Sequence, residues 1–321
     1  MQPVDYCHFL CVRKPIGITS FAAVSRVRRL AGTRRVGHLG TLDPMAEGVL
    51  PIALGRATRL IEYVSGDKRY LAEATLGVIT DTLDAQGEVL ERRDSSHIDE
   101  AMVSAALGEL AVRTTQIPPM ASALHHDGRR LYEIFREGGT VEVPPRPVRV
   151  DAITLVSMRA PRVVFDVSCG AGTYIRSLAR DLGEILGCGA HLSALSRLRR
   201  GPFSLDDAAS FEQLEADGLT PWLLEPHRVL DGLPWVSVSE GDAGSLRQGK
   251  RIAFGGDEAM LVTSPVEAGA PAEAGSADVT SDEGRVVAVS ALRGELVAVA
   301  RLVAGVLSPI KVFGAQGGGS S

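Results

Sequence analysis

The spacing of apolar and polar positions predicts a chain in which helices and strands alternate. Apolar side chains recur at helical spacing in three segments: 19–31, 57–64 and 98–110. Thr19 or Ser20 can cap the first of these helices. The apolar run 48–54 is typical of a buried strand, and the alternation in 68–93 predicts two strands joined around the turn Asp84–Gly87.

The pattern changes at two places and so divides the chain into regions. Between 112 and 150, prolines bracket one short helical stretch, LYEIFREG, which we interpret as part of a long excursion from the core. After residue 231 short apolar segments predict a small all-β barrel over 232–313. Within it, the acidic low-complexity stretch 265–284 is expected to be disordered, and 314–321 to form a loose tail.

Length and composition favour a large domain followed by a smaller one. The chain has 321 residues, 45% of them hydrophobic, which is enough for a substantial core. No apolar run reaches the roughly 18 residues that a membrane-spanning helix needs, and the chain does not begin like a signal peptide. Four cysteines are too few for a disulfide scaffold, so we expect reduced thiols and a cytoplasmic protein. Cys7 and Cys11 have no second ligand pair at zinc spacing, so we expect no metal.

The net charge of −5 hides an uneven distribution. Residues 1–70 carry eleven Lys and Arg against five Asp and Glu, whereas the rest of the chain is acidic. A local basic face can bind phosphates whatever the total charge. The arginines of 26–35 could form such a face, or could equally be the solvated side of a helix.

Residues 163–183 could belong to a methyltransferase that uses S-adenosylmethionine. An apolar strand with Asp166, a glycine turn and a helix follow one another there. That interpretation requires a second strand that ends in an acidic residue, and the sequence after the helix shows no apolar strand and no carboxylate before Asp206. Cys169 at the same turn could be a nucleophilic thiolate, or a small buried core residue.

The segment GHLGTLDPMAEGVLPIALGRATRL, which begins at Gly37, places Asp43 between glycines and a proline. Asp43 could be only a helix N-cap, with Pro44 at the first helical position. Alternatively, glycines such as Gly40 and Gly48 let the backbone approach a ligand, while the proline restricts Asp43 to extended conformations that direct its carboxylate. No Lys–Thr pair follows, so the segment is not a P-loop.

This segment resembles the signature loop of the TruB family of tRNA pseudouridine synthases. Four further stretches resemble that family's motifs in the same order: RKPIGITS (13–20), KRYLAEATLGVITDTLDAQG (68–87), GTYIRSLARDLG (172–183) and GAHLSALSR (189–197). The resemblance implies an α+β fold, in which a mixed β-sheet catalytic domain flanked by helices covers 1–231, with 112–150 as a thumb-like insertion. The β-rich end resembles the PUA domain, an RNA-binding barrel.

The resemblance also implies the reaction, which is the isomerisation of uridine to pseudouridine without a metal or organic cofactor. It places the essential aspartate at Asp43, as a nucleophile or an equivalent covalent participant. Whether this carboxylate attacks ribose C1′, attacks uracil C6 or promotes C1′ deprotonation stays open. Arg176 is implied to pair with the carboxylate, and Tyr70 to stack on the flipped target base.

Further residues are assigned through the same resemblance. Four are implied to form or support the substrate pocket: His38, which would fill the space that the flipped nucleotide leaves, Leu195, which would wall the pocket, Tyr174 and Asp84. Lys14, Arg197 and the arginines of 26–35 are expected to contact phosphates. His125 stands where a basic thumb residue is expected, which leaves its RNA contact open.

We therefore expect an enzyme that modifies the T-loop uridine at position 55 of tRNA. Its partner would be the T stem and T loop, with no membrane and no obligatory protein partner, and it would act as a monomer. A dyskerin-type synthase that depends on a guide RNA and a non-catalytic RNA chaperone remain alternatives. The thumb-like excursion favours the first interpretation, because an enzyme that acts alone must hold the tRNA itself.

Overall fold

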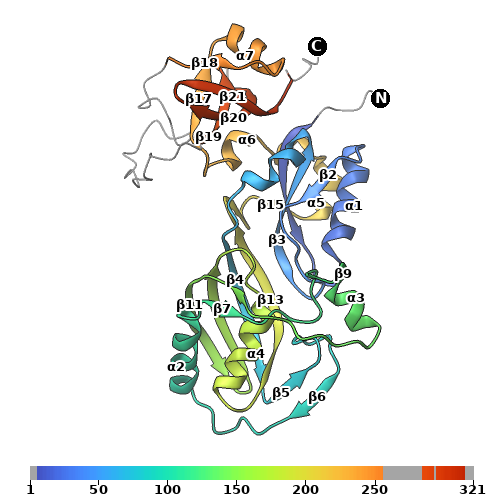
Figure 1. Ribbon diagram of the computed structural model, residues 1–321. Coiled ribbons are helices and arrows are strands. Elements are labelled where there is room, and N and C mark those ends of the chain that lie inside the picture. Colours follow the sequence, from blue (N-terminus) through green and yellow to red (C-terminus); the bar gives the residue numbers. More distant parts are fainter. Residues whose placement is uncertain (1–5, 256–283, 293, 315–321) are drawn as a thin grey trace.

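A computed structural model describes residues 6–255, 284–292 and 294–314, and most of this chain is built on one mixed sheet (Figure 1). The sheet has ten strands in the order β11-β12-β4-β13-β3-β1-β15, with β14, β16 and β2 paired to β13, β1 and β3. The bounds are β1 Cys7–Lys14, β2 Val36–His38, β3 Glu47–Gly55, β4 Lys68–Leu76, β11 Val150–Arg159, β12 Arg162–Cys169, β13 Ala190–Arg200, β14 Phe203–Ser204, β15 Ala208–Ala209 and β16 Leu223–Leu224.

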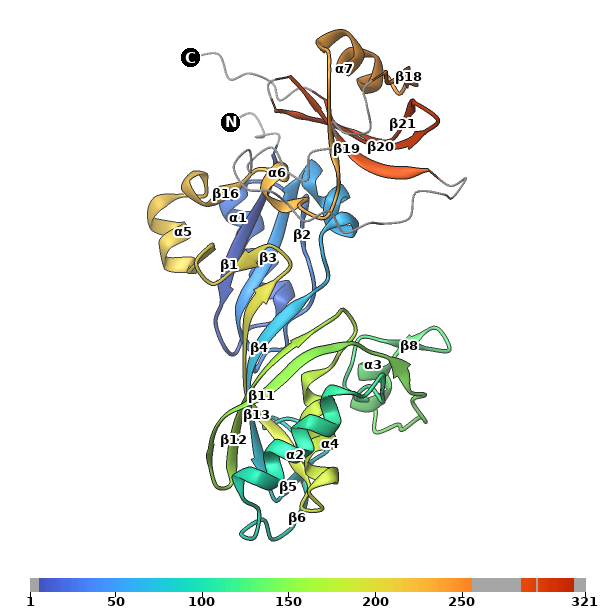
Figure 2. The ribbon, with the colours of Figure 1, turned by 90° about the vertical axis from the view of Figure 1, so that its left-hand side faces the viewer.

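Helices cover the two halves of this sheet separately (Figures 1 and 2). Helices α2 and α4 share a core with β4, β12 and β13, whereas α1 and α5 share a core with β1 and β3. The helical bounds are α1 Ser20–Ala31, η1 Arg56–Tyr63, α2 Glu100–Ala111, α3 Leu131–Arg136, α4 Ile175–Ile185, α5 Phe211–Asp217, η2 Thr220–Trp222, α6 Pro226–Val229 and α7 Glu240–Arg247. The expected α+β class, with a mixed sheet flanked by helices, is confirmed.

Helix α1 begins as its sequence predicts. The Thr19 side chain accepts a hydrogen bond from the Ala22 N–H at 3.0 Å, which satisfies one of the free donors of the first turn. Gly32 ends the helix in the left-handed conformation, with φ at +62°. The buried face of the helix, with Val24 and Val27, packs on the half of the sheet that contains β1 and β3.

The thumb-like segment 112–150 connects helix α2 to strand β11. It contains the predicted short helix, α3, and four short strands: β7 Thr115–Gln116, β8 His125–His126, β9 Arg129–Arg130 and β10 Arg146–Pro147. Strands β7 and β10 pair at its base, and β8 pairs with β9 in a small hairpin. A second hairpin, β5 Val78–Thr80 and β6 Val89–Arg92, follows β4, so the expected two strands of 68–93 are three.

The two halves of the sheet meet at a short parallel pairing between β13 and β3. Only Ser196 with Glu47 and Arg197 with Gly48 are in register there. Gly48 has φ at +104°, and a Cβ on it would lie 2.3 Å from the Arg197 carbonyl oxygen. We expected this glycine to let the backbone approach a ligand, but the structure uses it for close contact between two strands. The Asp43 loop lies directly before this joint.

The C-terminal region forms a second, five-stranded sheet in the order β17-β19-β20-β21-β18. Its strands are β17 Trp235–Val238, β18 Ile252–Ala253, β19 Arg285–Ala291, β20 Leu296–Val303 and β21 Val306–Val312. Among the described residues β17 and β18 are not paired with each other, so these five strands do not by themselves close the barrel that was expected. Residues 256–283, between β18 and β19, lie outside the described residues. Residues 265–283 of the acidic insertion and 315–321 of the tail lie outside the described residues.

The second sheet packs against the first through a shared core. Phe313 and Trp235 lie in one buried cluster with Phe9 and Phe203 of the large sheet. Arg56 and Arg59 in η1 donate hydrogen bonds to the carbonyls of Gly314 and Val312, at 2.7 and 2.8 Å. Among the residues that the structure describes, no helix has the length and apolarity needed to cross a membrane.

Candidate active site

The loop between β2 and β3 holds Asp43 in a fixed place. On one side the Leu42 N–H donates to Ser20 Oγ at 2.8 Å, and Ser20 Oγ donates to the Leu42 carbonyl at 2.9 Å. On the other side the Gly17 N–H donates to the Pro44 carbonyl at 2.8 Å. Residues 44–45 form a turn that leads into β3, so the alternative in which Asp43 caps a helix is wrong.

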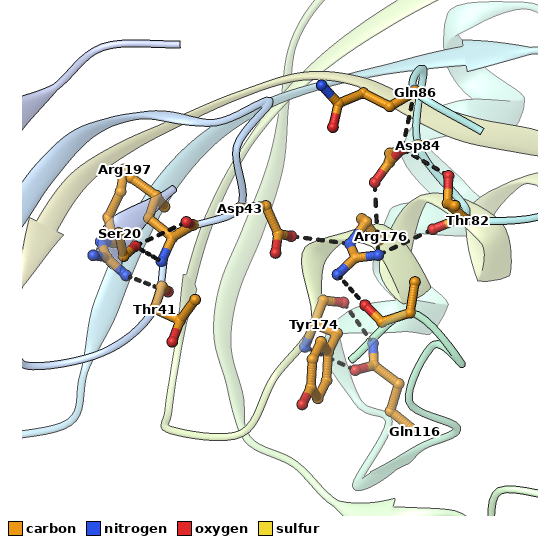
Figure 3. A network of polar contacts seen from close by, with 12 residues as sticks. Ser20, Thr41, Asp43, Thr82, Asp84, Gln86, Gln116, Tyr174, Arg176 and Arg197 are labelled. Atoms are coloured by element: carbon orange, nitrogen blue, oxygen red, sulfur yellow. Dashed lines mark hydrogen bonds and ion pairs between the residues drawn. The ribbon is translucent and has the colours of Figure 1, made fainter. Parts of the chain in front are cut away.

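Arg176 reaches Asp43 from the opposite half of the sheet (Figure 3). It lies in the first turn of α4, and its Nε is 3.0 Å from Asp43 Oδ2 in an ion pair. Only 6% of the Arg176 side chain is exposed, against 33% of the Asp43 side chain. The guanidinium is thus shielded from water while the carboxylate keeps one side open to an incoming group.

Three more acceptors surround the Arg176 guanidinium. It donates to the carbonyls of Thr82 at 3.1 Å and Ala121 at 3.0 Å, and its Nη1 lies 3.6 Å from Asp84 Oδ2. Asp84 is itself buried and accepts hydrogen bonds from the Thr82 hydroxyl at 2.7 Å and the Gln86 N–H at 3.0 Å. Asp84 therefore orders the turn between β5 and β6 and adds a second negative charge beside Arg176.

Lys14 and Arg197 do not lie where we placed them. Both are fully buried, and their donors bind main-chain carbonyls: Lys14 those of Pro15 and Ile18, both at 2.8 Å, and Arg197 those of Val49, Thr41 and Gly40, at 2.7, 3.2 and 3.2 Å. Burial, above all other effects, lowers the pKa of Lys14 to about 8. Arg197 therefore supports the Asp43 loop through Thr41 and Gly40, whereas Lys14 supports the segment 15–18. Neither side chain is exposed, so their expected contact with phosphates is not supported.

Tyr70 and Leu195 lie in one apolar cluster beneath the Asp43 loop. The cluster contains Leu42 and Met45 of the loop, and Tyr70 is only 5% exposed. Burial raises the pKa of the Tyr70 hydroxyl, which keeps it neutral. The structure brings both residues to the site as expected, but the Tyr70 ring is covered, so its stacking on a base stays a prediction.

His38 and Tyr174 belong to segments close to Asp43 and to Arg176 in the chain, β2 and the start of α4. His38 ends β2, is half-buried, and its Nδ1 accepts a hydrogen bond from the Gly40 N–H at 3.2 Å. Burial, followed by the charge of Arg197, lowers the pKa of His38, so its ring is neutral at neutral pH. Tyr174 precedes the first residue of α4 and is half-buried beside Arg176 (Figure 3).

Three residues in this arrangement were not found from the sequence. From the sequence, Ser20 is predicted as a possible helix cap and Thr82 as part of a strand pair. Gln116 is predicted as part of the Pro-bracketed excursion. Ser20 fixes Leu42, Thr82 offers its carbonyl to Arg176, and Gln116 binds the main chain of Tyr174. Each contact joins a main-chain group to a side chain far away in sequence, for which residue spacing gives no signal.

The competing interpretations of 163–183 do not agree with the structure. A strand, β13, does follow α4, contrary to our reading of that segment, but it ends in Arg199 and Arg200 and not in an acidic residue. Strand β4 also lies between β12 and β13 and is antiparallel to both, which is not the adjacent parallel pair of a nucleotide-binding unit. Cys169 is fully buried, and burial raises the pKa of its thiol to about 11, so it is a core residue.

In the described parts of the chain, no group of three His, Cys, Asp or Glu side chains could hold a metal ion.

Some arginines of the expected basic face, 26–35, already have partners within the protein. Arg26 forms an ion pair with Glu215 at 2.7 Å, and Arg28 donates to the Val36 carbonyl at 3.1 Å. The exposed arginines in this stretch are Arg29, Arg34 and Arg35. His125 is exposed in the β8–β9 hairpin.

Comparisons with known proteins agree with these motifs. A family model described as "TruB family pseudouridylate synthase (N terminal domain)" matches residues 28–175, and one described as "tRNA pseudouridylate synthase B C-terminal domain" matches 176–220. The chain is 45% identical to tRNA pseudouridine synthase B of Heliobacterium mobile, over 75% of this chain and 80% of that protein. It is 47% identical to the protein of the same name from Thermobifida fusca, over 76% and 86%.

Solved structures show the same fold at lower sequence identity. A chain in the crystal structure of a Cbf5–Nop10–Gar1 complex gives a TM-score of 0.67 at 23% identity, over 98% of this chain and 87% of that one. A chain in the structure of an H/ACA RNP bound to a substrate RNA containing 2′-deoxyuridine gives 0.66 at 22%, over 97% and 86%. At this identity the likeness establishes the fold alone.

Proposed function

This chain belongs to the TruB family of pseudouridylate synthases, and we propose that it isomerises the T-loop uridine at position 55 of tRNA to pseudouridine. The observation that carries the proposal is the Asp43–Arg176 pair. A carboxylate held in a fixed loop, with one open side, lies 3.0 Å from a buried guanidinium in an ion pair. The pair lies where the two halves of the sheet meet, beside an apolar cluster that can receive a base.

The chemistry needs one bond broken and one formed. The N1–C1′ glycosidic bond of uridine is cleaved, the uracil turns while it stays in the site, and a C5–C1′ bond forms. The proton leaves C5 and N1 gains one, so product and substrate are isomers and no cofactor is consumed. Asp43 acts as the nucleophile or equivalent covalent participant, at C1′, at C6 or through C1′ deprotonation.

The surrounding side chains have roles in holding the flipped nucleotide. Tyr70 stacks on the uracil once the side chains that cover its ring move aside. Leu195 lines the same pocket. Tyr174 lines the side next to Arg176. A neutral His38 suits the space left in the RNA, because an uncharged ring can stack there without a counterion. Stacking of this kind contributes about 1–3 kcal/mol per base, which offsets the cost of extracting the base.

The tRNA is held by more than the pocket. We assign the thumb-like segment 112–150 to the T stem and T loop, and the C-terminal sheet to a PUA-like RNA-binding role. The enzyme then acts as a monomer, without an obligatory protein partner. It works in the cytoplasm, in agreement with four cysteines that form no disulfide with one another.

Purified protein and an unmodified tRNA transcript test this function directly. Chemical mapping should find pseudouridine at position 55 with no other component added, and a transcript with cytidine at that position should give no product. Conversion that needs a guide RNA or accessory proteins would support the dyskerin-type alternative. Tight binding without any conversion would support an RNA chaperone.

Binding of tRNA should weaken steeply with salt. If about six phosphates are contacted, the affinity falls by about 10³-fold between 50 and 200 mM salt, because bound counterions are released. Replacing the exposed Arg34 and Arg35 with alanine should reduce the slope of log affinity against log salt by about two. Arg26→Ala is the matched control, because Arg26 already pairs with Glu215. A slope near zero for the parent protein would contradict the basic face.

A further inference from the structure

The base of the thumb-like segment is attached to the first turns of α4 by a buried amide. Gln116 is 4% exposed. Its Oε1 accepts a hydrogen bond from the Tyr174 N–H at 2.9 Å, and its Nε2 donates to the Tyr174 carbonyl at 3.1 Å (Figure 3). The side-chain amide thus matches the main chain of one residue, donor to acceptor and acceptor to donor, across 58 positions of the sequence.

The residues after Gln116 continue this attachment. The Ile117 carbonyl accepts from Ser177 Oγ at 2.9 Å and from Arg180 Nη2 at 3.2 Å. The Ala121 carbonyl accepts from Arg176 Nη2 at 3.0 Å. The base of the thumb-like segment and the helical turn that carries Arg176 are therefore joined at several points, of which Gln116 is the nearest to the helix start.

Tyr174 needs such a partner because the start of α4 is otherwise poorly capped. Tyr174 is the N-cap residue, and its side chain makes no capping hydrogen bond. Gln116 satisfies its N–H from outside the helix. Arg176 follows two residues later, so the position of the Tyr174 main chain determines the position from which the Arg176 side chain extends. A displacement of about 1 Å in such a group can cost about a hundredfold in rate.

We propose that Gln116 is a positioning residue for the isomerisation, which holds the Tyr174–Arg176 turn in register with Asp43 and couples that turn to the thumb-like segment. The proposal rests on the proposed function. Its consequence is that the segment expected to grip tRNA and the ion pair expected to do the chemistry do not move independently. RNA that displaces the base of the segment changes the orientation of Arg176.

Gln116→Leu is the decisive variant, because leucine keeps the volume and removes both hydrogen bonds. With enzyme in excess over tRNA, the single-turnover rate should fall about 10- to 100-fold while the tRNA dissociation constant changes less than about threefold. Ser177→Ala is the comparison, since it loosens the same segment at Ile117 without touching Tyr174, and should cost less than about threefold in rate. A wild-type rate for Gln116→Leu, or a loss confined to affinity, would overturn the proposal.

Gln116→Glu gives a readout that a purely structural role would not change. An ionised carboxylate faces the Tyr174 carbonyl with no donor, whereas the protonated acid can donate to it and still accept from the N–H, as the amide does. Burial and this carbonyl both favour the neutral form and raise the pKa of the new carboxyl. The charges of Arg146, in register with residue 116, and of Arg176 act in the opposite direction, and we expect the desolvation of the carboxylate to outweigh them. The rate relative to the parent protein should therefore rise severalfold as the pH falls from 8 to 6. A variant as slow as Gln116→Leu at every pH would show that the amide pairing is not what matters.

Hydrogen exchange separates the failure of this proposal from the failure of the proposed function. The Tyr174 amide should exchange slowly in the parent protein and at least about tenfold faster in Gln116→Leu, whether or not the protein makes pseudouridine. Equal exchange in both would refute the pairing. A parent protein that makes no pseudouridine would refute the function instead. If Gln116→Leu does not fold, the Gln116→Glu rate at pH 6 and pH 8 decides the matter.

Discussion

Asp43→Asn abolishes pseudouridine formation but leaves tRNA binding and the free energy of unfolding close to those of the parent protein. The change removes the negative charge and nucleophilicity and keeps the shape, so we expect the rate to fall on the order of 10⁴-fold or more. Stability changes little, because the loop is held through the main chain of its neighbours and Arg176 keeps Asp84 as a partner. Single-turnover conversion, filter binding and urea unfolding measure the three quantities.

Asp99→Asn is the matched control for this substitution. Asp99 caps α2, where its side chain accepts from the Met102 N–H at 2.9 Å, and asparagine caps a helix about as well as aspartate. The same chemical change should therefore leave the single-turnover rate unchanged at Asp99 and abolish conversion at Asp43. Appreciable turnover by Asp43→Asn would remove the carboxylate from the mechanism.

Arg176→Met should destroy both activity and much of the stability. It leaves the carboxylates of Asp43 and Asp84 without their cation, and the carbonyls of Thr82 and Ala121 without a donor. Removing one partner of a buried ion pair costs about 3–5 kcal/mol, mostly because the remaining charge is left unpaired. Urea unfolding measures the loss, and the single-turnover assay should show no product.

Two further variants test the reason for that loss. Adding Asp84→Asn to Arg176→Met should restore part of the stability, because one unpaired charge is then removed. Arg180→Met, one turn further along α4, should cost much less, since Arg180 is more exposed and Asp181 keeps Arg113 at 3.4 Å. An Arg176→Met protein as stable as Arg180→Met would mean that Arg176 is not the centre of the network.

Local features of the fold could be predicted from the sequence, because their causes lie within a few residues. Helix α1 with its Thr19 cap, the short helix α3, and the order of strand, glycine turn and helix around α4 follow from spacing and capping alone. Strand β13 could not be recognised, because its arginines read as a polar segment. One of them, Arg197, is buried, and its donors are satisfied by carbonyls about 150 positions away in sequence.

The same limit applies to the site. That Asp43 lies in a constrained loop follows from its proline and glycines. Its pairing with Arg176 joins segments more than 130 positions apart in sequence, and only the family resemblance indicated it. Lys14 and Arg197 were expected at phosphates through the family resemblance, and cations are usually exposed. Their burial depends on main-chain acceptors, which a sequence does not display. The order of the five described strands in the second sheet likewise depends on pairing between distant segments.

The shared core between the two sheets limits what deletion experiments can report. Because Phe313 and Trp235 pack in the same cluster as Phe9 and Phe203, a chain shortened before residue 235 would expose apolar surface on its catalytic half. Aggregation or low yield of such a fragment would then be mistaken for a defect in RNA recognition. Charge reversal at exposed positions of the second sheet, in the otherwise intact chain, is the experiment that isolates its part in recognition.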